Sequence, residues 1–283
     1  MSMKTVLILV FFVLTLNASE RLVSLSPSIT EIIYALEKGD KLVATSSYSL
    51  YPKEAQKLPI IGGYTNPNIE KILSYKPTLV IGQEFNEKTL RDLRHFNIKT
   101  LKIDLKTIQS IKKSIEILAK HINSNNALKL TSKIDNAIKN ASSHSLRKST
   151  KPHSVMIVYG LHVDLRNGIY IAGQDVFFND IINECKNTNI YTDNITSQPV
   201  LNYENVIALN PDQIIILHSK ATESKVDVNE ALQAWYKLPT NASKNKNIHI
   251  VDEDYLHIPS HRIALTIEKL CGVMNDWNNK AYM

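Results

Sequence analysis

The sequence predicts an α/β fold of two lobes, each a central, mainly parallel sheet flanked by helices, joined by a single long backbone helix. Three observations favour this class. Short apolar runs alternate with segments of helical periodicity, one unit of the sequence recurs in each half, and a polar segment without Gly or Pro separates the halves. The length of 283 residues also suits two domains of ordinary size better than one.

The first half begins with a strand-like run at 21–25, followed by a helix start that can be interpreted in two ways. Ser26 can cap the helix with Pro27 in its first turn, or Ser28 and Glu31 can form a capping box. Gly39 is expected to end this helix. Further strands are expected at 42–45, 78–81, 97–104, 154–159, 212–216 and 248–251, and further helices at 89–95, 108–121, 175–185 and 260–275.

A repeated unit predicts that the two lobes are related. A helix start, a proline and a buried strand run from 68 to 81, and the same pattern runs from 202 to 216 with constant offset. Glu70 in the first copy corresponds to Glu204 in the second. Chance recurrence of a common helix–proline–strand pattern is the alternative.

The segment from 125 to 145 is expected to form the connection between the lobes. It is polar, and a thin apolar stripe of Leu128, Leu130, Ile134 and Ile138 predicts a long, partly exposed helix. The expected organisation is a signal peptide at 1–19, an N-terminal lobe at 20–123, a linking helix at 124–150 and a C-terminal lobe at 151–283.

The first residues indicate export. A basic start, an apolar run at 5–16 and the small residues Ala18 and Ser19 are typical of a cleaved secretory signal peptide, with an uncleaved anchor as the alternative. The apolar run is short for a membrane span. No Cys lies near the cleavage region, so we expect a periplasmic protein that is not lipid-anchored.

Composition excludes several functions. The formal charge is +6, but the basic residues are scattered among acids, so nucleic-acid binding is not expected. Only 8 Gly are present, and no phosphate loop or nucleophile motif occurs, so we expect no catalytic residue and no cofactor. Cys185 and Cys271 are the two cysteines; in an exported protein they suggest one disulfide, and two buried thiols are the alternative.

Four stretches carry a family resemblance: 22–31, 46–52, 62–70 and 76–80. They resemble the class III, helical-backbone receptors of ABC importers, which bind cobalamin, haem or ferric siderophores. The resemblance implies a monomeric receptor with a ligand cleft between its lobes, no catalysis and a permease partner in the inner membrane. It implies that Glu70 and Glu204 dock on that permease, the alternative being ordinary solvated carboxylates at helix starts. The cysteine pair also stands where the cobalamin branch has its disulfide.

The same resemblance implies a ligand site in which cobalamin or another corrinoid is favoured. Haem or a ferric siderophore is the alternative, with His257 and His261 as axial ligands; a surface-loop His and a helix-start His are the structural interpretation. Gln83 and Gln198 stand where the cobalamin branch has Trp. The loss of two stacking faces implies either a ligand other than cobalamin or a differently seated corrinoid. The expected ligand-binding residues are Tyr48, Tyr64, Gln83, Tyr170, Gln198, Asp254 and Tyr255.

Overall fold

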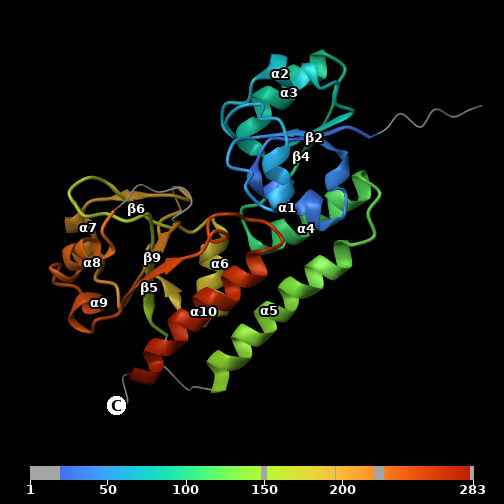
Figure 1. Ribbon diagram of the computed structural model, residues 1–283. Helices are drawn as coiled ribbons and strands as arrows, with labels where there is room; N and C mark the ends of the chain where they lie inside the picture. Colours follow the sequence, from blue (N-terminus) through green and yellow to red (C-terminus); the bar gives the residue numbers. More distant parts are fainter. Residues whose placement is uncertain (1–19, 148–151, 195, 220–225, 281–283) are drawn as a thin grey trace, which may run out of the picture.

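The computed structural model describes residues 20–147, 152–194, 196–219 and 226–280, and within them two parallel sheets form two lobes (Figure 1). We call the elements from β1 to α4 the N lobe and those from β5 to α10 the C lobe. The expected signal peptide lies outside the described residues. None of the helices in the described ranges is long and apolar enough to cross a membrane.

The N lobe is built on a four-stranded sheet in the order β2–β1–β3–β4, with every pair parallel. Its strands are β1 (Leu22–Ser24), β2 (Leu42–Thr45), β3 (Leu79–Gly82) and β4 (Lys99–Lys102). Its helices are α1 (Pro27–Ala35), α2 (Ile69–Ser74), α3 (Glu87–His95) and α4 (Ile108–His121), with short 3₁₀ helices η1 (Gly39–Lys41), η2 (Lys53–Lys57) and η3 (Glu84–Asn86).

The C lobe has a second parallel sheet in the order β10–β9–β5–β7 and a small antiparallel pair of β6 with β8. Its strands are β5 (Ser154–Tyr159), β6 (Ile169–Tyr170), β7 (Thr188–Asn189), β8 (Val200–Leu201), β9 (Gln213–His218) and β10 (Ile248–Asp252). Its helices are α6 (Phe177–Glu184), α7 (Tyr203–Leu209), α8 (Val228–Tyr236), α9 (Asn241–Lys244) and α10 (Ile263–Lys280).

The start of α1 decides between the two expected caps. The Ser26 side chain accepts a hydrogen bond from the Ile29 amide, and Pro27 occupies the first turn. The capping box expected of Ser28 and Glu31 is wrong, because the Glu31 carboxylate binds Arg262 of the C lobe instead. Gly39 as the helix terminator is also wrong, because α1 ends at Ala35 and Gly39 begins η1.

The repeated sequence unit is repeated in structure. Both α2 and α7 begin after an Asn N-cap whose side chain accepts from the backbone three residues on, and both lead to a buried central strand. Each helix is followed by a left-handed residue before its proline, Lys76 with φ 46° and Asn210 with φ 52°. Glu70 and Glu204 are each the second residue of their helix.

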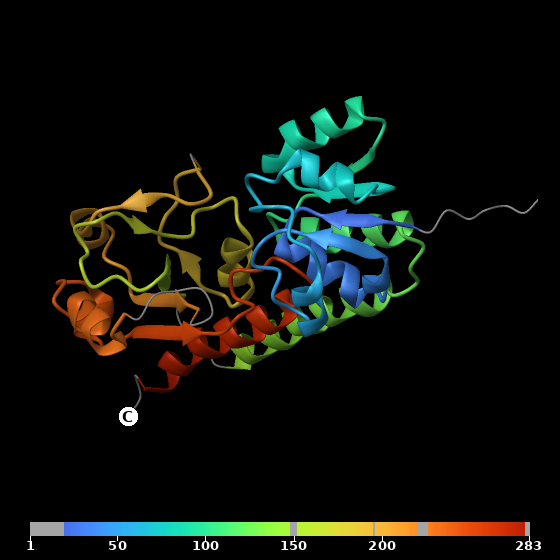
Figure 2. The same ribbon diagram turned by 45° about the horizontal axis from the view of Figure 1, so that its top comes forward.

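The two sheets are joined by α5 (Ala127–Arg147), which lies side by side with α10 in two views (Figures 1 and 2). The expected apolar stripe is partly wrong, because Leu128 is 76% exposed. The buried face of α5 is formed by Leu130, Ile134, Ala137 and Ala141, at the i, i+4, i+7 and i+11 spacing of a helix. The exact division of the chain into lobes and linking segment stays our proposal.

The lobes share one apolar core. A single cluster of buried side chains contains Ile29 of the N lobe, Ile134 of α5 and Val155 of the C lobe. A polar contact also joins the lobes: the Asp180 carboxylate of α6 accepts a hydrogen bond from the Ile108 amide at the start of α4, at 2.8 Å. The predicted Cys185–Cys271 disulfide is present and joins the end of α6 to α10.

Candidate functional site

The candidate site is a cleft between the lobes at the carboxyl ends of their strands, where parallel sheets commonly place ligands. Ser26 follows β1, Gln83 follows β3, Asp104 follows β4, and Tyr159 ends β5. Two cavities of about 680 and 380 Å³ occupy it. They share five lining residues and therefore form one continuous cleft: Tyr64, Gln83, Phe85, His257 and Pro259.

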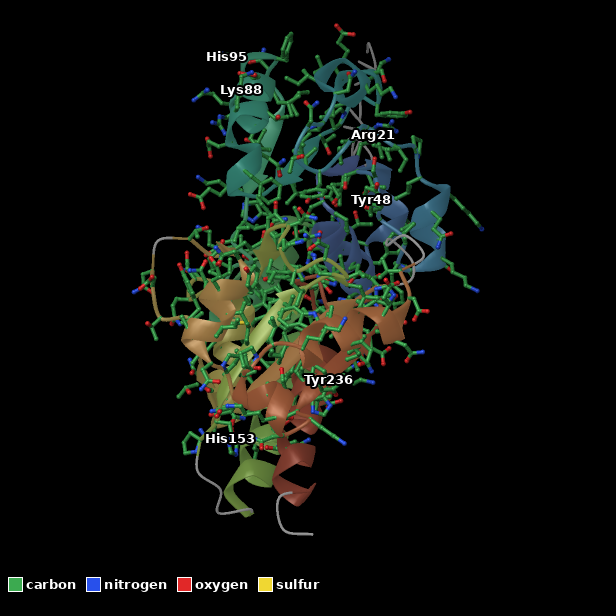
Figure 3. The ribbon with its side chains drawn as sticks, turned by 90° about the vertical axis from the view of Figure 1, so that its left-hand side faces the viewer. Arg21, Tyr48, Lys88, His95, His153 and Tyr236 are labelled. Carbon is green, nitrogen blue, oxygen red and sulfur yellow. A yellow bond between two sulfur atoms is a disulfide. The ribbon has the colours of Figure 1, made fainter. Side chains whose placement is uncertain are left out.

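The N lobe presents three exposed aromatic rings to the cleft. Tyr64 and Phe85 pack edge to face with ring centroids 5.8 Å apart, and Tyr48 lines the smaller cavity. Tyr48 is 63% exposed and has a left-handed φ of 65°, an unusual conformation for a bulky residue. Ser47 fixes this loop, since its amide and hydroxyl both donate to the Gly62 carbonyl. Figure 3 shows Tyr48 on the part of the N lobe nearest the C lobe.

The C lobe supplies a more deeply buried aromatic wall. Phe177 and Phe178 at the start of α6 lie with ring centroids 4.1 Å apart, and Tyr159 packs edge to face on Phe178 at 5.7 Å. Burial raises the pKa of the Tyr159 hydroxyl, so it stays protonated. The His257 ring lies 5.9 Å from Tyr159 and completes this wall. A flat ligand in the cleft therefore meets aromatic surface on both sides.

Charged groups surround one end of the larger cavity. Lys106 pairs with Glu84 of the N lobe at 2.7 Å and approaches Asp175 of the C lobe at 3.8 Å. The hydrogen bond to Glu84 raises the pKa of Lys106, and its counterpart lowers the pKa of Glu84. With Asp104, the lining holds three carboxylates and one ammonium group, a formal surplus of two negative charges.

A buried ion pair outside the cleft lining joins the lobes. Arg262 forms a bidentate pair with Glu31 and also binds Asp254 at 2.9 Å, while its guanidinium lies 4.0 Å from the centre of the Tyr51 ring. Ser260 donates a further hydrogen bond to the Glu31 carboxylate. Burial raises the pKa of Glu31, and Arg262 only partly offsets that effect.

Five of the sequence-predicted residues meet in the cleft, and four lie elsewhere. Tyr170 belongs to β6, Asp254 pairs with Arg262, and the Tyr255 ring centre lies 5.7 Å from the same guanidinium. His261 has a partly buried side chain outside both linings. The residues that do line the cleft are Tyr48, Tyr64, Gln83, Gln198 and His257.

Sequence reasoning missed the residues that form most of the aromatic surface. Phe85 lies two positions after Gln83 and lines the same cavity. Its ring therefore supplies an aromatic face close to the position where the cobalamin branch has Trp and this chain has Gln83. The Phe177-Phe178 pair at the start of a predicted helix was a second available signal. Tyr159, at the carboxyl end of a predicted strand, was the third, because such ends border clefts in parallel sheets.

Glu70 and Glu204 lie away from this cleft. Both are exposed, and α2 and α7 stand at the outer parts of the two lobes, distant from α5 and α10 (Figure 1). Across the described part of the chain, no three His, Cys, Asp or Glu side chains are grouped so that they could hold a metal ion.

The fold of two α/β lobes is shared with a known class of proteins. Residues 22–255 match the family described as periplasmic binding protein, and the chain belongs to it. Members of the family bind small ligands and work with the permeases of ABC importers.

Individual relatives place the chain more narrowly. It is 30% identical over 274 residues to the vitamin B12-binding protein of Vibrio vulnificus, covering 93% of this chain and 94% of that one. Among solved structures, the periplasmic vitamin B12-binding protein BtuF of Vibrio cholerae is 27% identical with a TM-score of 0.74, covering 91% and 97% of the two chains. The apo periplasmic heme-binding protein RhuT of Roseiflexus sp. RS-1 is 26% identical with a TM-score of 0.75, covering 92% and 99%.

Proposed function

We propose that this protein is a monomeric, non-catalytic periplasmic receptor that captures a corrinoid and delivers it to an ABC importer. The observation that carries the proposal is the interlobe cleft, whose aromatic side chains come from both lobes. Tyr64 and Phe85 on one side and Tyr159 and Phe178 on the other suit a flat, largely apolar macrocycle. The relatives named for vitamin B12 support the same ligand class.

Haem is the second candidate, because His257 lines both cavities and imidazole is a common iron ligand. The charge of the cleft favours a corrinoid over haem. Haem carries two carboxylates, and the lining of the larger cavity already holds a surplus of negative charge around Lys106. The amide side chains of a corrinoid are neutral, so they meet no such repulsion.

Titration calorimetry with cyanocobalamin and hemin tests the ligand. We expect cyanocobalamin to bind the mature protein more tightly than hemin, and Phe85→Ala to weaken its binding about tenfold by removing one ring face. Phe96→Ala is the matched control, because Phe96 is similarly exposed but lies at the end of α3 outside the cleft. Tighter binding of hemin, or of a ferric siderophore alone, would contradict the corrinoid assignment.

We also propose that Glu70 and Glu204 dock the receptor on its permease. They occupy the same position of the same structural unit, one in each lobe, and both are exposed. Two acids at separate points suit two basic points on a pseudo-symmetric membrane partner. Exposed charges of this kind set encounter rate and register more than affinity.

A further inference from the structure

Two glutamines flank the cleft from opposite lobes and are not explained by aromatic stacking. Gln83 follows β3 in the N lobe and lines both cavities, and Gln198 precedes β8 in the C lobe and lines the larger one. An uncharged amide offers both a donor and an acceptor, so each can bind a polar group of a ligand without adding charge.

Gln83 is held in one orientation by its neighbours. Its backbone amide donates to Asn86 Oδ1 at 3.0 Å, and its side-chain Nε2 donates to Ser26 Oγ at 2.9 Å. Asn86 is itself fixed, since its Nδ2 donates to the Tyr64 carbonyl at 2.7 Å. The Gln83 side chain also accepts from the Asn86 backbone amide, so its amide group is held in place at the cleft wall.

The backbone that carries Gln198 is positioned on both sides. The Ile171 amide donates to the Pro199 carbonyl at 3.0 Å, and the Gly173 amide donates to the Ser197 carbonyl at 2.9 Å. The approach at Gly173 is so close that an added Cβ would lie 2.4 Å from the Thr196 carbonyl oxygen. Only glycine therefore keeps this segment in its place.

Gln198 also has a polar neighbour on the cleft wall. Its side chain lies beside the Tyr159 hydroxyl, whose buried oxygen makes no hydrogen bond of normal geometry to the described residues. A phenol hydroxyl can donate and accept, so a ligand group that reaches this wall can bind it together with Gln198. Gln198 and Tyr159 together therefore form a second polar point, on the lobe opposite Gln83.

We propose that Gln83 and Gln198 determine which chelate the cleft accepts, by hydrogen-bonding amide groups that project from the two faces of a corrinoid ring. This inference rests on the proposed function and specifies it. Corrinoid rings carry amide side chains both above and below the ring plane, whereas the polar groups of haem are carboxylates at one edge. Polar side chains on opposite walls of the cleft thus match the amides of a corrinoid. Haem would place only apolar ring faces against Gln83 and Gln198.

The test compares Gln83→Leu, Gln198→Leu and the double variant with the wild type by calorimetry against cyanocobalamin, dicyanocobinamide and hemin. Each single change should weaken both corrinoids about 3- to 10-fold, the net worth of one hydrogen bond, and the double change more than either. Hemin affinity should stay within about twofold. Gln109→Leu on the exposed face of α4 is the matched control, and thermal unfolding checks that each variant folds.

Dicyanocobinamide keeps the ring amides but lacks the lower nucleotide, so it separates two sources of polar contact. Loss confined to cyanocobalamin would overturn the inference, because the glutamines would then contact the nucleotide. Unchanged corrinoid affinity, or equal losses for hemin, would overturn it as well. A wild-type protein that binds neither corrinoid would refute the proposed function itself, and the inference with it.

Discussion

At the scale of single residues, His261 connects the interlobe contact to pH. Its Nδ1 is buried without a hydrogen-bond partner among the described residues, and it lies near the cations Arg262 and Lys133. Burial, with a smaller effect of those two charges, lowers the pKa of His261 to about 4. As the pH falls below about 6.5, the unfolded chain takes up a proton at His261, whereas the folded protein keeps it neutral until about pH 4.

The sign of the resulting pH dependence follows from linkage. Because the folded pKa lies below the unfolded one, this contribution to stability is fully present above about pH 6.5 and is lost as the pH falls toward 4. Between pH 7 and 5 the wild type should lose up to about 2 kcal/mol more unfolding free energy than His261→Leu in urea titrations. His95→Leu, an exposed control at the far end of the N lobe (Figure 3), should keep the wild-type slope, and parallel slopes for all three proteins would refute the assignment.

Particular residues show where sequence reasoning succeeds. Local signals such as the helix starts and prolines of the repeated unit, the apolar runs of β5 and β9 and the helical period of α4 predict their elements closely. Those elements depend on neighbours in the chain.

Contacts between distant segments were not predictable in the same way. Glu31 looks like a capping-box residue, yet it pairs with Arg262, 231 positions later. The family resemblance assigns Asp254 to the ligand, yet the loop that follows β10 brings Arg262, eight residues later, to its carboxylate. Burial on α5 shifts from Leu128 to Ala137 and Ala141 because α10 packs against that side.

At the scale of elements, the disulfide links the cleft wall to the long helices. Cys185 ends α6, the helix that carries Phe177 and Phe178, and Cys271 lies in α10 beside α5. The bridge closes a loop of 86 residues, for which the chain-entropy model gives a stabilisation of about 4–5 kcal/mol as an upper figure. Its loss should therefore loosen α6 as well as lower global stability.

We expect the unfolded, unreduced protein to show no free thiol on titration. The variant with Cys185→Ala and Cys271→Ala should unfold at lower urea concentration than the wild type, by up to about 4–5 kcal/mol. Wild-type protein unfolded under reducing conditions is the control and should match the variant. Two titratable thiols before reduction would refute the bridge.

At the scale of the whole molecule, docking can be tested by charge reversal. Glu70→Arg together with Glu204→Arg should reduce transport by the reconstituted importer, because like charges would then face each other across the interface. Ligand affinity of the free receptor should stay near wild type, since neither residue lines the cleft. The control, Glu116→Arg with Glu268→Arg, makes the same charge change in exposed positions on α4 and α10. Collapse of ligand affinity in the first variant would place these acids in the pocket.

The apolar core that spans both lobes also determines how the protein unfolds. Ile29, Ile134 and Val155 belong to one cluster, so neither sheet can unfold without exposing side chains of the other. The two lobes should therefore lose structure as one cooperative unit. Ile72 of α2 and Val206 of α7 belong to separate, smaller clusters on the outer faces. Those helices can open and exchange their amide hydrogens locally while the cleft keeps its shape.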